Sequence, residues 1–280
     1  MKQQPSEMEV SAAPEVVNTP SSTSLASGSI ATDSNDPRFM QLRRYVAIAR
    51  PSHYSKNVLV IVGAVLSGMC HAELVTTSSL IRLAVGLIAT CLIASSNYVL
   101  NEILDAKNDR FHKAKRGRPL AAGHISRRIA FIEWGVLAAF GLLIASTVSW
   151  SFFVCALSFQ LMAIAYNVPP VRLKDIPYID VLSEAVNSPI RVLLGWLAVS
   201  PTDRPSISLI LAFWMAGALL MARKRFREFH FLGDRATAAL YRKSFAHYDE
   251  QRLKISMFLC AIAMLISGGY EAWKLIKKFV

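Results

Sequence analysis

The chain has 280 residues, of which 53% are hydrophobic and 18% charged, and its formal net charge is +12. This composition is too apolar for an ordinary soluble domain of this length and favours an integral membrane protein. Nucleic-acid binding is not indicated, because Lys and Arg occur in short stretches between apolar segments and form no single long basic surface. The four cysteines lie far apart, and their spacing matches neither a zinc site nor a redox motif.

Residues 1–38 are rich in Ser, Thr, Pro and Ala, carry scattered acids and show no apolar periodicity. Such a segment cannot bury enough surface to offset the entropy of ordering. We therefore expect a disordered tail, followed by one transmembrane domain over residues 39–280. No apolar stretch follows Lys2, so the tail does not have the pattern of a secretory signal peptide.

The rest of the chain predicts an all-α, polytopic membrane bundle with about seven transmembrane helices. Several apolar segments have the 20 or so residues that span hydrocarbon. The segments are residues 57–70, 80–100, 129–147, 150–166, 179–199, 207–222 and 255–276. The first is short, and the fifth carries polar residues that are costly when they face lipid.

The charges of the connections predict an orientation. With the tail in the cytoplasm, the connections at 101–128, 167–178 and 223–254 are cytoplasmic and those at 71–78 and 200–206 lie outside. Lys and Arg are abundant in the first and third inner connections and almost absent from the outer ones, as the positive-inside rule expects. An odd helix count, however, places the C-terminal lysines (Lys274, Lys277 and Lys278) outside. Either the last segment does not span fully, or a further helix is missing.

An acidic cluster lies at the end of the second apolar segment, in the sequence NEILDAKND. Asn101, Asp105 and Asp109 are four residues apart, so on a continuing helix they share one face, which Glu102 borders. Such oxygen ligands suit Mg²⁺, which is usually completed by water and substrate phosphates. The alternative is a solvated helix end whose acids pair with the neighbouring cations Lys107, Arg110 and Lys113.

Four cations, Lys113, Lys115, Arg116 and Arg118, lie after the acidic cluster. A diphosphate or a phosphate headgroup requires such residues once a metal has neutralised part of its charge. The alternative is topology alone, because the positive-inside rule explains basic residues here without any function.

The second inner connection contains YNVPPVRLK, in which Pro169 and Pro170 end a helix and hold Arg172 and Lys174 in an extended segment. Tyr166, at the helix end, is either an interfacial anchor, the commoner role, or a hydrogen-bond donor to a substrate oxygen. Two more cations are thus expected near the membrane surface.

A polar stripe follows on the fifth apolar segment, where Asp180, Glu184, Asn187 and Arg191 share one helix face. Such a stripe is costly in lipid and predicts an interior cavity. An ion pair between Glu184 and Arg191 is the competing explanation.

The third inner connection has more cations and fewer acids than the first. Its charged residues include Lys224, Arg225, Arg227, Glu228, Asp234, Arg242 and Lys243. Topology brings the three polar clusters to one side of the bundle, where their combined chemistry is that of a metal with a polyphosphate.

Together these stretches resemble the UbiA superfamily of intramembrane transferases over about residues 45–254. NEILDAKND looks like the family's first aspartate motif, with Glu102 where the family usually has Asp, and KRGRPLAAGHIS and YNVPPVRLK are similar to the segments that follow it. The resemblance implies a helical bundle with a cytoplasm-facing cavity. It also implies nine helices, so we expect that a final hairpin is missing here.

Two branches of this superfamily are candidates. One transfers a prenyl group from a polyprenyl diphosphate to an aromatic acceptor. The other, decaprenyl-phosphate phosphoribosyltransferase, transfers 5-phosphoribose from phosphoribosyl diphosphate to a polyprenyl phosphate. RPSHYSKNVLV, ARKRFRE and YRKSFAHYDEQRL resemble segments of the second branch. The mainly basic third connection also favours it, because this donor brings an additional phosphate.

The resemblance and the residues favour Mg²⁺-dependent phosphoribosyl transfer to a polyprenyl phosphate at a bacterial inner membrane, with the site loops cytoplasmic. Asp105, Asp109 and Tyr166 are expected to be catalytic, and Asn101 and Glu102 to join the two aspartates as metal ligands. The expected substrate-binding residues are Lys56, Asn101, Arg118, Lys174, Asp180, Lys224, Arg225 and Glu228. The alternatives are prenyl transfer to an acceptor such as 4-hydroxybenzoate, and a non-catalytic transporter or scaffold.

Overall fold

The computed structural model describes residues 36–110, 114–233, 239 and 242–279. Helices account for most of this part of the chain, which contains no strand, so the all-α prediction is confirmed. Almost all of the predicted tail lies outside the described residues, as do Lys113 and Asp234.

The chain enters the bundle through a surface helix and a tight turn. Helix α1 (Pro37–Ala49) begins after Asp36, whose side chain accepts a hydrogen bond from the backbone of Arg38, and it has Pro at its first position, a favoured start. Arg50 then adopts a left-handed conformation, with φ of 51°. This residue redirects the chain into the 3-10 helix η1 (Pro51–Asn57), which leads into α2 (Val58–Cys70).

Three long helices build one side of the bundle. The short η2 (Ala72–Leu74) precedes α3 (Thr77–Asp109), which starts with a capping box of Thr76 and Ser79. Helix α4 (Arg127–Val148) runs back beside α3 and is followed by α5 (Trp150–Asn167). The buried apolar core between α3, α4, α5 and α7 includes Ala89, Ile93, Phe152, Phe159 and Leu194.

The fifth apolar segment is not one helix. After the short η3 (Leu173–Asp175), it forms α6 (Ile179–Ala185) and α7 (Asn187–Val199), with a break at Val186. Helix α7 packs closely on α2 at Gly195. A Cβ added there would lie only 1.8 Å from the carbonyl oxygen of Val60, so only glycine allows this approach. The break places the polar residues of this segment inside the bundle.

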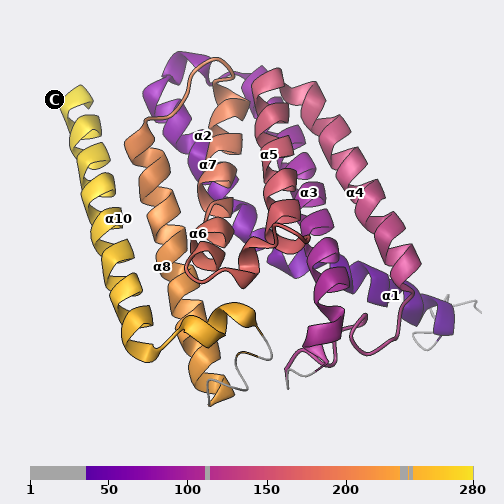
Figure 1. Cartoon of the computed structure of the whole chain (residues 1–280). Coiled ribbons are helices and arrows are strands. Elements are labelled where there is room, and N and C mark those ends of the chain that lie inside the picture. Colours follow the sequence, from indigo (N-terminus) through magenta and orange to yellow (C-terminus); the bar gives the residue numbers. More distant parts are fainter. Residues whose placement is uncertain (1–35, 111–113, 234–238, 240–241, 280) are drawn as a thin grey trace, which may run out of the picture. The chain divides into compact units, whose positions relative to one another are not determined.

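Helices α8 (Ile207–Leu232) and α10 (Glu250–Phe279) form an antiparallel pair, with η4 (Lys243–His247) between them. Ser206, before α8, donates a hydrogen bond of 2.6 Å to Glu271, near the end of α10. The C-terminus therefore lies at the opposite end of the bundle from the end of α3 (Figure 1).

Five helices of the described chain, α3, α4, α5, α8 and α10, are long and apolar enough to cross a membrane. The other two of the seven predicted segments are shorter, because α2 has 13 residues and residues 179–199 are divided. Helix α10 is long enough to span, which disfavours the expectation that the last segment crosses incompletely.

Candidate active site

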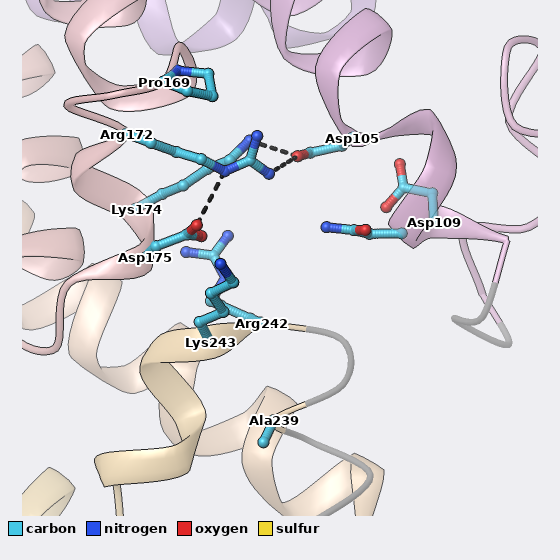
Figure 2. Close-up of a pocket in the computed structure, with 10 residues that line it drawn as sticks. Asp105, Asp109, Pro169, Arg172, Lys174, Asp175, Ala239, Arg242 and Lys243 are labelled. Atoms are coloured by element: carbon cyan, nitrogen blue, oxygen red, sulfur yellow. Dashed lines mark hydrogen bonds and ion pairs between the residues drawn. The ribbon is translucent and has the colours of Figure 1, made fainter.

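A pocket of about 510 Å³ opens at the end of the bundle where α3 ends. Three segments that are distant in sequence enclose it: the last turns of α3, the connection after α5 and the stretch before η4 (Figure 2). Its lining residues are Asp105, Asn108, Asp109, Pro169, Arg172, Lys174, Asp175, Ala239, Arg242 and Lys243. The predicted meeting of acidic and basic stretches at one end of the bundle is thus present.

The two aspartates of α3 face this pocket from successive turns, as their spacing predicts. Asp105 accepts a hydrogen bond from Lys174 and lies 3.7 Å from a guanidinium nitrogen of Arg172. Asp109 accepts a hydrogen bond of 2.6 Å from Arg118. Both carboxylates therefore have cations as partners in this structure (Figure 2 shows those of Asp105).

Lys174 reaches the pocket from η3. Its side chain is only 4% exposed and also donates a hydrogen bond of 2.8 Å to the amide oxygen of Asn167. Burial lowers the pKa of the Lys174 ammonium from its usual value, while the negative charge of Asp105 acts in the opposite direction. Lys174 is thus a buried cation that depends on an anion beside it.

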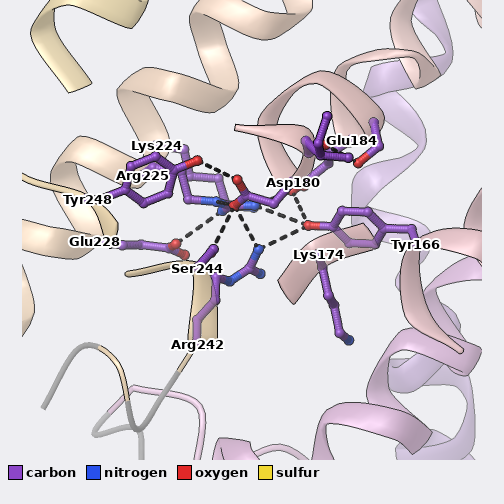
Figure 3. A network of polar contacts seen from close by, with 12 residues as sticks. Tyr166, Lys174, Asp180, Glu184, Lys224, Arg225, Glu228, Arg242, Ser244 and Tyr248 are labelled. Atoms are coloured by element: carbon purple, nitrogen blue, oxygen red, sulfur yellow. Dashed lines mark hydrogen bonds and ion pairs between the residues drawn. The ribbon is translucent and has the colours of Figure 1, made fainter. Parts of the chain in front are cut away.

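A second charged cluster, which we call the Arg225 network, lies beside the pocket (Figure 3). The fully buried guanidinium of Arg225 donates to Asp180 (2.8 Å), Glu184 (2.6 Å) and Glu228 (3.1 Å). The hydroxyl of Tyr166 accepts a further bond from Arg225 and donates one of 2.8 Å to Glu184. Three carboxylates and a phenol oxygen thus accept hydrogen bonds from one buried guanidinium.

Arg242 belongs to both the pocket and the network. Its guanidinium donates to the Tyr166 hydroxyl (3.1 Å) and to Asp180 (3.3 Å), and it lines the pocket. Tyr248 attaches the same segment to α6, because its hydroxyl donates to Asp180 and accepts a 2.7 Å bond from the backbone of Tyr178. The sequence analysis included Tyr248 in the segment YRKSFAHYDEQRL but did not name it as a site residue, because its partners lie about 70 residues away.

The remaining predicted site residues take different places. Asn101 lies one turn before Asp105, and its buried amide oxygen has no hydrogen-bond partner among the described residues. Glu102 turns away from the pocket and accepts hydrogen bonds from Arg50 (3.1 Å) and from the backbone of Leu120 (3.5 Å). This position does not agree with the prediction that Glu102 is a metal ligand in the pocket.

Lys56 and Lys224 lie outside the pocket lining, as do the predicted site residues Tyr166, Asp180, Arg225 and Glu228 of the Arg225 network. Lys56 is over the ring of Tyr98, at 5.5 Å from its centroid. Lys224 donates a hydrogen bond of 3.2 Å to Glu184, so this carboxylate pairs with α8 and not with Arg191. The ion pair considered for Glu184 and Arg191 is not formed.

The oxygen donors at the end of α3 fit a Mg²⁺ ion that a substrate completes. Among the described residues, no three His, Cys, Asp or Glu side chains converge in a way that could hold a metal by themselves. Mg²⁺, however, is often bound by one or two carboxylates together with water and substrate phosphates. Asp105, Asp109 and the unpartnered amide oxygen of Asn101 provide such a donor set.

A polar, cation-rich pocket at the end of a bundle whose long helices can cross a membrane is the arrangement expected of an intramembrane transferase. The comparisons agree with this class. The UbiA prenyltransferase family model matches residues 60–276, and the chain belongs to this family. The resemblance stated from the motifs is confirmed, and the non-catalytic alternative is set aside, because the matching family is one of transferases.

Several relatives carry the name decaprenyl-phosphate phosphoribosyltransferase. The protein of Mycolicibacterium smegmatis is 29% identical over 229 residues, which cover 81% of this chain and 70% of the relative. The protein of Mycobacterium tuberculosis is 31% identical over 232 residues, covering 82% and 74%. A solved UbiA homolog from Archaeoglobus fulgidus, bound to GPP and Mg²⁺, superposes with a TM-score of 0.66 at 22% identity over 81% of this chain and 77% of that one, which confirms the fold.

Proposed function

We propose that this membrane transferase moves 5-phosphoribose from phosphoribosyl diphosphate to a polyprenyl phosphate. The observation that carries this proposal is the lining of the pocket. Four cations, Arg172, Lys174, Arg242 and Lys243, line it together with three aspartates, and among the residues that the structure describes no large apolar side chain does. A sugar donor with a diphosphate and a further phosphate suits such a lining better than an apolar prenyl chain does. The names of the two mycobacterial relatives support the same donor.

The acids of α3 would hold the metal. Asp105 and Asp109, helped by Asn101, would bind Mg²⁺, which neutralises the charge that develops on the departing diphosphate. Lys174 and Arg172, now in contact with Asp105, would exchange this carboxylate for donor phosphates. Arg118 would do the same from Asp109.

The cations of the connection between α8 and α10 would bind the 5-phosphate of phosphoribosyl diphosphate. Arg242 is held by Tyr166 and Asp180, so its position is fixed before any substrate arrives. Lys243, next to it, is exposed at the pocket. Positioned charges of this kind contribute most when they need no rearrangement during the reaction.

In the transfer step, an oxygen of the acceptor phosphate forms a bond to C1 of the ribose while the bond from C1 to the diphosphate oxygen breaks. The diphosphate leaves with its electron pair. The acceptor's chain would lie between helices or in lipid, with the pocket on the cytoplasmic side of a bacterial inner membrane, where the soluble donor is made.

The test uses purified protein in detergent with Mg²⁺, phosphoribosyl diphosphate and a short polyprenyl phosphate, and it measures diphosphate release. We expect release that requires the lipid and falls by on the order of 10²–10³ in Asp105→Asn, a loss typical of removing one electrostatic group from an active site. Asp203→Asn is the matched control, because Asp203 lies in the connection between α7 and α8, outside the pocket lining, where it accepts a hydrogen bond from Ser200.

Prenyl transfer is the second candidate, and the solved homolog that binds GPP and Mg²⁺ favours it. The same preparation is therefore supplied with a polyprenyl diphosphate and 4-hydroxybenzoate. Diphosphate release in this arm, without release from phosphoribosyl diphosphate, would replace the proposed donor.

A further inference from the structure

Arg191 is a buried cation without an acidic partner. It lies on α7, is 6% exposed, and donates hydrogen bonds of 2.9 Å to the amide oxygen of Asn57 and to the carbonyl oxygen of Asn187. The ring of Phe159 faces its guanidinium at 4.7 Å. All of these partners are neutral, and no ion pair within the described part of the chain includes Arg191.

Arg225, in the same bundle, provides a comparison, because acidic side chains compensate its charge. Arg225 is also buried, but three carboxylates lie within 3.1 Å of its guanidinium. A buried charge without such compensation is costly, because neutral dipoles replace only part of its hydration. The environment of Arg191 therefore lacks an anion that the environment of Arg225 contains.

A neighbouring lysine adds to the positive charge. Lys56 lies over the ring of Tyr98, at 5.5 Å from its centroid; Arg50 lies over the same ring at 5.6 Å, but its charge is paired with Glu102. Burial lowers the pKa of the Lys56 ammonium, and the charges of Arg191 and Arg50 lower it further, against the opposing effect of Glu184. That carboxylate is already bound by Lys224 and by Arg225 of the network.

Unsatisfied polar atoms connect this region to the pocket. The amide oxygens of Asn97 and Asn101, on α3, are buried and have no partner in the described structure, and neither does Nδ1 of His53 on η1. Tyr98 and Asp105 are two helical turns apart, about 10 Å along α3. This separation is comparable with the length of a diphosphate and the sugar carbon attached to it.

We propose that Arg191, with Lys56, binds the monophosphate headgroup of a lipid, deeper in the bundle than the pocket of the donor. The identification of this lipid as the acceptor rests on the proposed function, whereas the anion site rests on the charges around Arg191. An anion held there supplies the missing counter-charge, near the start of α7, because the Arg191 guanidinium turns back to the carbonyl oxygen of Asn187.

Binding without turnover tests the site. Native mass spectrometry on detergent-purified protein, without donor or Mg²⁺, compares a polyprenyl phosphate, the corresponding polyprenol and inorganic phosphate. We expect at least about tenfold tighter binding of the lipid phosphate than of the alcohol, and loss of this preference in Arg191→Gln. Equal binding of inorganic phosphate and lipid phosphate would overturn the lipid assignment, and an unchanged preference in Arg191→Gln would overturn the site.

A second variant separates binding from a structural link between η1 and α7. Asn57→Asp puts a carboxylate against Arg191, where the amide oxygen now lies at 2.9 Å. We expect an internal ion pair, with unchanged or higher thermal stability and loss of the preference for the lipid phosphate. If Arg191 only joins the two elements, this variant keeps the preference, which contradicts the proposal.

Arg82→Gln is the matched control. Arg82 also holds α7, through the carbonyl oxygens of Ala198 and Val199, but at the other end of that helix, so its replacement should leave the preference intact. Because none of these measurements needs turnover, a failed phosphoribosyl assay with intact lipid-phosphate binding would reject the donor and keep the anion site.

Discussion

Arg118 donates a hydrogen bond of 2.6 Å to Asp109, nine residues before it, so a cation of the basic stretch is paired with a carboxylate that we propose for Mg²⁺. Lys174 likewise donates a hydrogen bond to Asp105, and Arg172 forms an ion pair with it at 3.7 Å. The acids of α3 thus pair with cations, as the alternative interpretation of this motif expects, but the partners differ from the expected neighbours. Arg110, for example, donates to the carbonyl oxygen of Ala121. Metal binding has to replace these contacts.

Replacing Arg118 with Gln should alter metal and donor binding in opposite directions. Once the Arg118 guanidinium is removed, Asp109 is more available to Mg²⁺, so the half-saturating Mg²⁺ concentration should fall. The KM for phosphoribosyl diphosphate should rise about tenfold, because a charge-assisted contact to phosphate is lost. Steady-state kinetics over a Mg²⁺ titration measure both. Arg116→Gln, at an exposed cation of the same stretch, should change neither, and equal effects of the two substitutions would contradict a specific role.

Tyr166→Phe should weaken donor binding and leave the chemical step almost unchanged. The hydroxyl lies beside the pocket and holds Arg242 at 3.1 Å, so its loss loosens a cation of the pocket. We expect a several-fold higher KM for the donor and a kcat within about twofold, in contrast with the roughly 10²–10⁴-fold losses typical of a direct proton-transfer group. A kcat loss of that size would instead show that the Tyr166 hydroxyl acts directly on the reacting atoms.

Arg225→Gln should destabilise the protein severely. Removing one partner of a buried charge cluster costs about 3–5 kcal/mol, because the remaining charges are left without compensation. Here Asp180, Glu184 and Glu228 would all lose a contact. Denaturant unfolding in detergent gives the free energy of unfolding, and Arg227→Gln, an exposed neighbour, should stay close to the wild type. Similar values for the two variants would show that the network does not stabilise the fold.

Glu102→Gln should leave the Mg²⁺ dependence of the activity unchanged. The side chain is buried against Arg50 and the backbone of Leu120, away from the pocket, so its loss should lower the thermal unfolding temperature instead. Asp105→Asn, a turn away, serves as the contrasting variant. A large rise in the half-saturating Mg²⁺ concentration for Glu102→Gln would restore its predicted role as a ligand.

Periodicity predicted the register of α3, because Asp105 and Asp109 at a spacing of four must share a face once the helix continues. It did not predict the break at Val186, since residues 179–199 are apolar enough to be taken as one helix. Pro189 was an available signal, because it has no N–H to donate to the carbonyl oxygen of Ala185. The Arg225 network could not be predicted, because its members come from three helices and a loop whose mutual approach no local pattern specifies.

Helix α3 has 33 residues and is about 50 Å long, roughly 20 Å more than the hydrocarbon thickness of a membrane. Because the apolar stretch of α3 ends at Leu100, the turns that carry Asp105 and Asp109 would continue out of the lipid as a rigid extension of a membrane-spanning helix. A soluble donor would reach them from water, while a lipid acceptor would arrive by lateral diffusion. With the donor saturating, the turnover rate would then follow the surface density of the acceptor in the bilayer. Adding inert lipid would lower this density and slow the enzyme, even when the total concentration of the acceptor in the sample is unchanged.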